Sequence, residues 1–327
     1  MRMVRFAIIG TNNISHTFMD AAKKVDGFVL EAVYSRKRET GENFAKQYGV
    51  KKVYTSLKEL GNDPEVDAVY VASPNSCHCS QTIQMLEAGK HVLCEKPIAT
   101  TAEEFEEMLD AAKKHKRIFL EAMRPVYDPG FAKIKELLGQ LGAIRRATFQ
   151  FCQYSSRYDA FKQGDVKNAF NPALGNAALM DIGIYCVHPA VALFGMPKEI
   201  VSTSLFLENG MEGAGTALLN YSDKIVELRY SKITNSFQPS EIQGEKGCMY
   251  IWQIQDIKKI EIHYRNQSVE TWEIDKEDNN MYYEIDTFIK LIHNPQGLEL
   301  AEMYQNWSCM EMKVADIIRE KSGIEFK

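Results

Sequence analysis

The chain has 327 residues, of which 45% are hydrophobic and 25% are charged, and its formal net charge is -5. This length exceeds the size at which one hydrophobic core usually stops growing, so we expect two domains. The net negative charge argues against a nucleic-acid-binding protein, which needs a basic surface, and favours a small-molecule ligand.

The cysteines and the apolar segments indicate where such a protein works. Seven cysteines, an odd number scattered along the chain, do not form a disulfide framework. The apolar run near the N-terminus is too short for a signal sequence, and no stretch approaches about 18 consecutive apolar residues. We therefore expect a cytoplasmic protein that is neither exported nor inserted in a membrane.

Residues 3–121 alternate short apolar runs with amphipathic helical patterns, which is typical of βαβ units and a parallel sheet. One helix is predicted over 101–115, with Thr100 as its N-cap and Glu103 completing a capping box. The sequence thus predicts a doubly wound α/β domain over residues 1–122. Its apolar runs are 6–9, 29–34, 68–72, 91–94 and 118–120.

After Arg124-Pro125 the pattern changes to long β-rich tracts between helices. Helices are expected over 129–138, 177–194, 281–293 and 300–320, and a polar, aromatic-rich loop precedes residue 174. Consecutive strands with short turns imply antiparallel pairing. Residues 123–327 should therefore form an α+β domain with a large, mostly antiparallel open sheet that binds substrate and supports oligomerisation. The expected strands are 144–154, 200–207, 215–221, 225–232, 240–253, 257–264 and 268–274.

A glycine-containing turn follows the first apolar run and opens a helix, where dinucleotide-binding folds place a pyrophosphate. Asn12 stands at the second glycine position of the usual motif and Ser15 at the third, so we expect Asn12 to tolerate an unusual φ. An ordinary strand-to-helix turn is the alternative. The predicted cofactor contacts here are Gly10, Thr11, Asn12, Asn13 and Ile14.

The end of the second strand carries Ser35, Arg36 and Arg38 and no carboxylate. An NAD enzyme usually has an acidic residue here for the ribose 2′-hydroxyl, whereas guanidinium groups suit a 2′-phosphate. We predict NADP, with NAD possible; a solvated basic turn is the alternative.

Two further strand ends carry a Ser73-Pro74-Asn75 segment with His78, and the tripeptide Glu95-Lys96-Pro97. Together with the runs 171–185 and 242–247, they resemble the Gfo/Idh/MocA oxidoreductases, in particular the dimeric dihydrodiol dehydrogenases and NADP-dependent xylose dehydrogenases. The resemblance implies that these residues contact the cofactor and that the Lys96-Pro97 peptide bond is cis. Asn176, where the family usually has glycine, is a departure.

Hydride transfer to or from an alcohol requires a proton to move at the oxygen, so a titratable group must sit beside it. The resemblance implies that Lys96 and Tyr185 supply that group. Asp181, Tyr185 and His188 follow helical spacing and are expected on one face, where Asp181 would accept a substrate hydroxyl or orient Lys96. For Tyr185 the alternative is a packed aromatic ring. A His188 satisfied by a backbone carbonyl is favoured over a catalytic one.

Polar and aromatic residues that could line a carbohydrate pocket follow the first domain. Tyr154 belongs with them, and the predicted substrate contacts are Lys96, Arg124, Tyr127, Arg157, Asn171, Asp181, Tyr185 and His188. No metal site is predicted, because the side chains of Cys77-His78-Cys79 diverge and no second cluster completes four ligands.

The sequence therefore predicts an NADP-dependent oxidoreductase acting on a sugar, polyol or dihydrodiol, working as a homodimer through the C-terminal sheet. A catalytically silent nucleotide- or sugar-sensing protein of the same fold is the alternative, and the altered phosphate loop keeps it open. A third hypothesis, NAD-recycling glycoside cleavage, is disfavoured by the basic residues after the second strand.

Overall fold

In the computed structural model, which describes residues 2–326, the chain divides into two compact units, each made of two segments. The first unit comprises Met1–Ala122 with Glu277–Cys309, and the second comprises Met123–Lys276 with Met310–Lys327. No helix among the described residues is long and apolar enough to cross a membrane.

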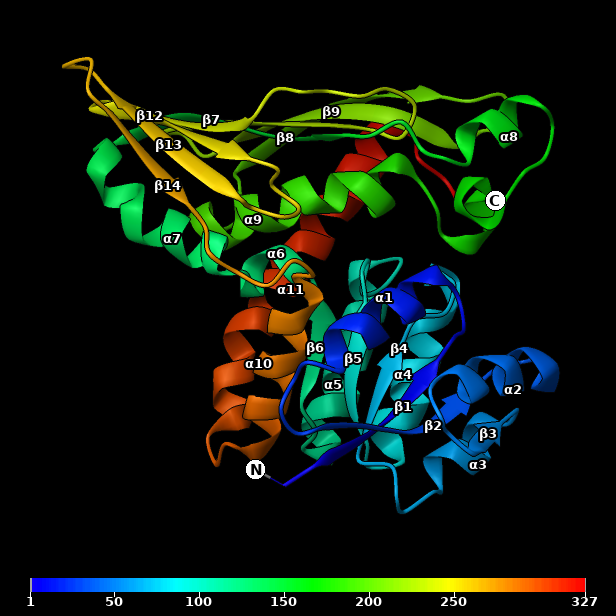
Figure 1. The fold of residues 1–327 in the computed structure, drawn as a ribbon. Helices are drawn as coiled ribbons and strands as arrows, with labels where there is room; N and C mark the ends of the chain where they lie inside the picture. The colour runs from blue at the N-terminus through cyan, green and yellow to red at the C-terminus, as the bar shows by residue number, and fades with distance from the viewer. Residues whose placement is uncertain (1, 327) are drawn as a thin grey trace. The chain divides into compact units, whose positions relative to one another are not determined.

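The first unit contains a six-stranded parallel sheet in the order β3-β2-β1-β4-β5-β6 (Figure 1). This order reverses beside β1, which confirms the doubly wound α/β prediction. Every residue of β4 is buried, as expected for a central strand covered on both faces. The elements up to residue 122 are β1 (Val4–Ile9), α1 (Asn13–Ala22), β2 (Phe28–Tyr34), α2 (Arg38–Gln47), β3 (Lys52–Tyr54), α3 (Leu57–Gly61), β4 (Ala68–Val71), η1 (Asn75–Cys77), α4 (His78–Glu87), β5 (His91–Glu95), α5 (Ala102–His115) and β6 (Phe119–Ala122).

The capping box predicted for α5 is displaced by one residue. Thr101, not Thr100, is the N-cap, and its hydroxyl accepts from the Glu104 N–H at 3.1 Å. Glu104 in turn accepts from the backbone and hydroxyl of Thr100 at 2.8 and 2.6 Å. Two consecutive threonines followed by two glutamates offered two registers, and the sequence alone did not decide between them.

The late helix α10 (Met281–His293) and the first half of α11 (Gly297–Ser322) belong to the first unit. Phe288 packs against Phe6 of β1 with ring centroids 5.9 Å apart, and Gln305 donates to the Phe119 carbonyl at 3.0 Å. Assigning every residue after 122 to the second domain was therefore wrong. The sequence order did not reveal that the chain returns to the first unit, because these helices pack against strands that lie far earlier in the sequence.

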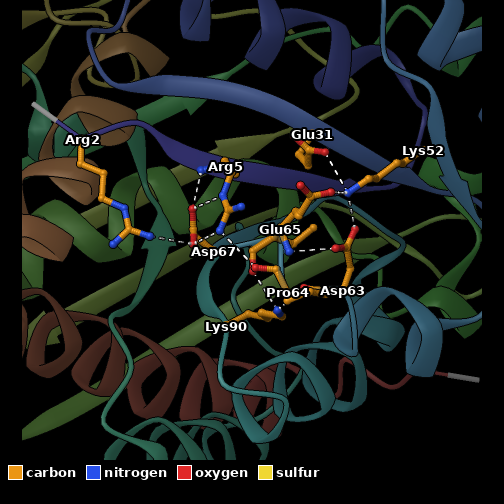
Figure 2. Close-up of polar contacts among 10 residues, drawn as sticks. Arg2, Arg5, Glu31, Lys52, Asp63, Pro64, Glu65, Asp67 and Lys90 are labelled. Atoms are coloured by element: carbon orange, nitrogen blue, oxygen red, sulfur yellow. Dashed lines mark hydrogen bonds and ion pairs between the residues drawn. The ribbon is translucent and has the colours of Figure 1, made fainter.

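Ion pairs connect residues of β1, β2 and β3 with one another and with the loop between α3 and β4 (Figure 2). The Arg5 side chain donates to both carboxylate oxygens of Asp67 at 2.9 Å, and its backbone N–H donates to the same group at 3.0 Å. Lys52 contacts Glu31, Asp63 and Glu65, with the first two at 2.9 and 3.0 Å. The side-chain hydrogen bond from Arg5 is the main cause of a lowered pKa of Asp67.

The second unit is built on an eight-stranded sheet in the order β14-β13-β12-β11-β7-β10-β9-β8. Only the β7–β10 pair is parallel, so the predicted, mostly antiparallel sheet is confirmed. The strands are β7 (Ile144–Cys152), β8 (Glu199–Phe206), β9 (Glu212–Asn220), β10 (Ile225–Ser231), β11 (Ser240–Gly244), β12 (Gly247–Trp252), β13 (Lys259–Tyr264) and β14 (Val269–Glu273), and the helices before β8 are α6 (Arg124–Tyr127), α7 (Pro129–Leu137), η2 (Leu138–Leu141), α8 (Tyr158–Lys162), η3 (Asn168–Phe170), η4 (Pro172–Leu174), η5 (Leu179–Gly183) and α9 (Ile184–Phe194).

Two local predictions for this unit were wrong. The expected strand over 240–253 is two strands, β11 and β12, joined by a tight turn at 245–246, which agrees with the turn that the resemblance implies within 242–247. The expected helix over 177–194 begins with a π-helical turn, η5, before α9 continues as an α-helix. Gly183, in this turn, packs closely against Tyr230. A Cβ at this position would come within 2.8 Å of the Tyr230 ring, which explains the glycine.

We predict that Asp67→Asn lowers the thermal midpoint more at pH 7 than at pH 3. The pKa of Asp67 is depressed in the folded protein, so its stabilising contribution is present above the unfolded value near 3.8 and disappears as pH falls through the lower folded value. Melting curves of both proteins at the two pH values test this. An equal difference between variant and wild type at both pH values would contradict it.

Candidate functional site

The turn from β1 to α1 is held directly against the end of β4. Gly10 has φ +108°, and a Cβ on it would lie 2.5 Å from the Ala72 carbonyl oxygen, so no other residue fits here without displacing the backbone. The N–H groups of the first turn of α1 follow at once. The anion-binding site that the sequence predicts at Gly10, Thr11, Asn12, Asn13 and Ile14 falls on this backbone and stays a prediction.

Asn12 does not adopt the unusual φ expected of it. Its φ of -90° and ψ of -178° are extended backbone that any residue adopts. Its side chain accepts from the Ser15 N–H at 3.3 Å and donates to the Ala72 carbonyl at 2.9 Å. The Ser15 hydroxyl donates to the Gly10 carbonyl at 3.0 Å. Both replacements of glycine therefore brace the turn.

The residues predicted to select the 2′-phosphate stand together after β2. Ser35 is buried, and its hydroxyl lies 2.9 Å from that of Thr40. Arg36 and Arg38 are exposed, and Arg38 lies 3.7 Å from Glu42 one helical turn later. Two guanidinium groups are thus available beside the strand end.

The segment Ser73–His78 follows β4, beside the Gly10 turn. The hydroxyl oxygen of Ser73 is buried with no hydrogen-bond partner in the structure, as expected of a group that a ligand would satisfy. The ring nitrogens of His78 lie 2.9 Å from the Pro97 carbonyl and 3.0 Å from the Ser73 carbonyl. Burial lowers the pKa of His78. His78 therefore braces the two loops at Ser73 and Pro97.

The tripeptide Glu95-Lys96-Pro97 ends β5, and the Lys96-Pro97 peptide bond is cis, as the resemblance implies. Glu95 is buried and accepts hydrogen bonds from the Tyr70 hydroxyl and, at 3.2 Å, from the Lys96 N–H. The Ile98 N–H donates to Glu121 at 3.1 Å. These contacts fix the backbone that carries the Lys96 side chain.

In the second unit, Tyr185 meets Arg124. The Arg124 guanidinium donates to the phenol oxygen at 3.1 Å and lies 5.7 Å from the ring centroid, while Phe151 packs edge-on against the ring. Tyr185 is buried, and its phenol oxygen accepts a hydrogen bond from a cationic side chain.

Asp181 and His188 do not share the surroundings of Tyr185. One Asp181 carboxylate oxygen lies 2.9 Å from the Lys232 ammonium, and the side chain keeps 36% of its exposure. His188 is buried and contacts the buried carboxylate of Glu311. We interpret His188 as a structural residue, although its partner is a carboxylate rather than the backbone carbonyl considered from the sequence.

The remaining predicted substrate residues lie in α6 and in the segment 154–176. Asn171 accepts from the Ala173 N–H at 3.1 Å and caps η4, while Arg157 is exposed before α8 and Tyr127 is partly exposed. The Tyr154 hydroxyl contacts Asp159 and Lys162 at 2.7 Å. Asn176 donates to the Asn168 and Asn171 carbonyls at 2.7 and 3.1 Å, which accounts for asparagine in place of glycine.

Family models match both parts of the chain. The model of an oxidoreductase family with an NAD-binding Rossmann fold, Gfo/Idh/MocA, matches residues 4–123, and the model of the Gfo/Idh/MocA C-terminal domain matches residues 131–250. The chain belongs to the Gfo/Idh/MocA oxidoreductase family. Membership confirms the resemblance stated from the sequence.

Individual members of this family match over most of their length. The scyllo-inositol 2-dehydrogenase (NADP+) of Bacillus subtilis is 42% identical over 99% of this chain and 98% of that protein. The trans-1,2-dihydrobenzene-1,2-diol dehydrogenase of Xenopus laevis is 31% identical over 76% of this chain and 74% of its own. An aldose-aldose oxidoreductase from Caulobacter crescentus shares the fold, with a TM-score of 0.86 at 22% identity over 98% of both chains.

Proposed function

We propose that this Gfo/Idh/MocA protein is an NADP-dependent oxidoreductase that moves a hydride between nicotinamide and a hydroxyl or carbonyl of a sugar, polyol or dihydrodiol. The observation that carries the proposal is the 42% identity, over nearly the whole of both chains, to a relative named for scyllo-inositol and NADP+. Identity at this level over full length favours a shared reaction type, and scyllo-inositol is the natural first substrate to test.

The first unit suits a dinucleotide. The glycine whose missing Cβ leaves room at Ala72, the start of α1 and the unpartnered Ser73 hydroxyl would receive the pyrophosphate and neighbouring groups. Ser35, Arg36 and Arg38 would bind the 2′-phosphate. Nicotinamide, when bound, supplies the hydride chemistry. The further proposed cofactor contacts are Pro74, Asn75, Glu95, Lys96 and Pro97, with His78 bracing their loops.

We assign the proton at the reacting oxygen to Lys96 and Tyr185. Lysine can donate to or polarise an oxygen, and a tyrosine beside a cation can hold or release its proton. Arg124 supplies that cation for Tyr185. Asp181, partly exposed, accepts a hydrogen bond from a substrate hydroxyl, and Arg124, Tyr127, Arg157 and Asn171 contribute further polar contacts.

The sensing alternative depended on Asn12 weakening the phosphate loop. Asn12 has ordinary extended backbone and caps α1, so this reason for preferring a silent protein is gone. The activity test below decides between the oxidoreductase and the silent sensing protein.

We propose a homodimer formed through the exposed face of the second unit's sheet, because apolar side chains are exposed along β8, β9 and β10, at Val201, Leu205, Leu218 and Ile225. Burying them against a second copy would remove apolar area from water. Sedimentation at micromolar concentration should give particles of twice the 37.3 kDa chain mass, and monomers alone would contradict this proposal.

We propose that the protein works in the cytoplasm, since its seven cysteines are unpaired in the structure. Cell fractionation tests this location, and recovery in an oxidising compartment would refute it.

We predict NADP+-dependent oxidation of scyllo-inositol, or of another member of a panel of aldoses, polyols and dihydrodiols, at a rate that falls at least about 100-fold in Lys96→Ala. Absorbance of the reduced cofactor is the measurement. Tight NADP binding without turnover anywhere on the panel would instead favour the sensor.

We predict that Arg36→Ala reduces the preference for NADP over NAD by about tenfold or more, because one charge-assisted contact to phosphate is lost. Titrating each cofactor into the wild type and the variant measures the ratio. Lys37→Ala, a neighbouring exposed cation outside the proposed set, is the control. An unchanged ratio in Arg36→Ala would refute the assignment.

A further inference from the structure

A buried lysine of the second unit lies against the candidate carboxylate. Lys232 directly follows β10 and is 1% exposed. Its ammonium lies 2.9 Å from a carboxylate oxygen of Asp181 and donates to the Ala169 carbonyl at 2.7 Å. Burying an ammonium is costly unless it is paired and hydrogen-bonded. The two contacts therefore determine where this side chain can lie.

The backbone around Asp181 is fixed from the same side of the sheet. The Leu179 N–H, at the start of η5, donates to the buried Glu212 carboxylate at 2.7 Å. Glu212 also accepts from the Ser204 hydroxyl at 2.6 Å and from the Tyr230 hydroxyl at 3.1 Å. Burial raises the pKa of Glu212. With the main chain of η5 anchored by Glu212, Lys232 orients the Asp181 side chain.

Lys232 also joins η5 to the segment that carries Asn171. Its ammonium lies 4.9 Å from the centroid of the Phe170 ring, a cation–π distance, while it bonds the carbonyl of Ala169. Phe170 is fully buried and stacks on Tyr158 and Phe161. The Lys232 side chain thus contacts both Asp181 and the aromatic cluster formed by Tyr158, Phe161 and Phe170.

We propose that Lys232 is a positioning residue: it holds Asp181 by one carboxylate oxygen, with a compensating positive charge beside it, in the orientation in which Asp181 receives a substrate hydroxyl. The inference rests on the proposed function, since it gives Asp181 a substrate to receive. Lys232 itself contacts no reacting atom in this account.

The chain supplies a matched control at the opposite end of β10. Lys224 pairs with Asp223 at 2.8 Å and lies 5.6 and 5.7 Å from the ring centroids of Tyr221 and Phe194. The two lysines flank β10, and each has a carboxylate partner and a nearby aromatic ring. Asp223 belongs to no proposed site, so the two lysines differ in the role of the carboxylate.

The experiment compares Lys232→Met, Lys232→Gln, Lys232→Arg and Lys224→Met in the full-length protein, with scyllo-inositol and NADP as probes. We expect kcat/KM for the polyol to fall about 10- to 100-fold in the Met and Gln variants, as misplacement of a substrate-orienting group does. NADP affinity should stay within about twofold, because the pyrophosphate and 2′-phosphate groups are assigned to the first unit. Lys232→Arg should recover most of the loss, and Lys224→Met should resemble the wild type.

A double-mutant cycle separates positioning from general destabilisation. If Lys232 acts through Asp181, Lys232→Gln has little further effect on kcat/KM in an Asp181→Asn background. Independent, multiplicative losses would overturn the proposal, and so would wild-type kcat/KM in Lys232→Gln. Should Lys232→Met fail to fold, the Gln variant and this cycle still decide.

Amide hydrogen exchange supplies a readout without turnover. Residues 168–183 should exchange faster in Lys232→Gln than in the wild type, and Lys224→Met should leave them unchanged. Unaltered exchange in Lys232→Gln would overturn the connection between η5 and the aromatic cluster. If the wild type showed this connection but turned over no polyol, the proposed function would fail while the contact stood.

Discussion

The candidate cofactor site depends on one close contact, the approach of the Gly10 backbone to the carbonyl of Ala72. Because a Cβ at Gly10 would lie 2.5 Å from that oxygen, the first turn can rest on the end of β4 only with glycine there. Asn12 donates to the same carbonyl and caps α1. The turn and the helix N-terminus are thereby held together beside Ser73, where we propose that phosphate oxygens bind.

The second unit uses buried polar groups for a comparable purpose. Glu212 anchors the backbone of η5, Lys232 holds Asp181, and Arg124 contacts the hydroxyl of Tyr185. A buried ion or hydrogen-bonded carboxylate contributes little net stability by itself, because desolvation offsets the attraction. Fixing the orientation of neighbouring side chains is the better explanation for why these groups lie inside.

Much of the fold could be predicted from the sequence because its apolar periodicity is unambiguous. Short buried strands alternating with amphipathic helices indicated the first sheet, and the Glu95-Lys96-Pro97 tripeptide indicated the family. Long-range packing could not be predicted in the same way: α10 returns to the first unit because Phe288 meets Phe6, a contact that no local pattern records. The π-helical turn η5 was missed because its spacing over five residues looks like ordinary α-helix.

The candidate site was predictable where strand ends carry polar residues, as at Ser35, Ser73 and Lys96. Lys232 and Glu212 were missed from the sequence because a charged residue at a strand end usually faces solvent. Glu212 begins β9, and Lys232 directly follows β10. The signal that could have found Lys232 is its place directly after Ser231, at the buried end of β10. Distance in three dimensions, not spacing in sequence, associates Lys232 with Asp181.

The most direct test of the central claim follows the hydrogen itself. Scyllo-inositol deuterated at its ring carbons is incubated with the protein and NADP, and the reduced cofactor is examined by NMR for deuterium at the nicotinamide C4. We predict transfer of one deuterium to a single face of the nicotinamide ring. Reduced cofactor without deuterium would contradict direct hydride transfer from the polyol, and bound NADP that is never reduced by this or any panel substrate would contradict the assignment of an oxidoreductase.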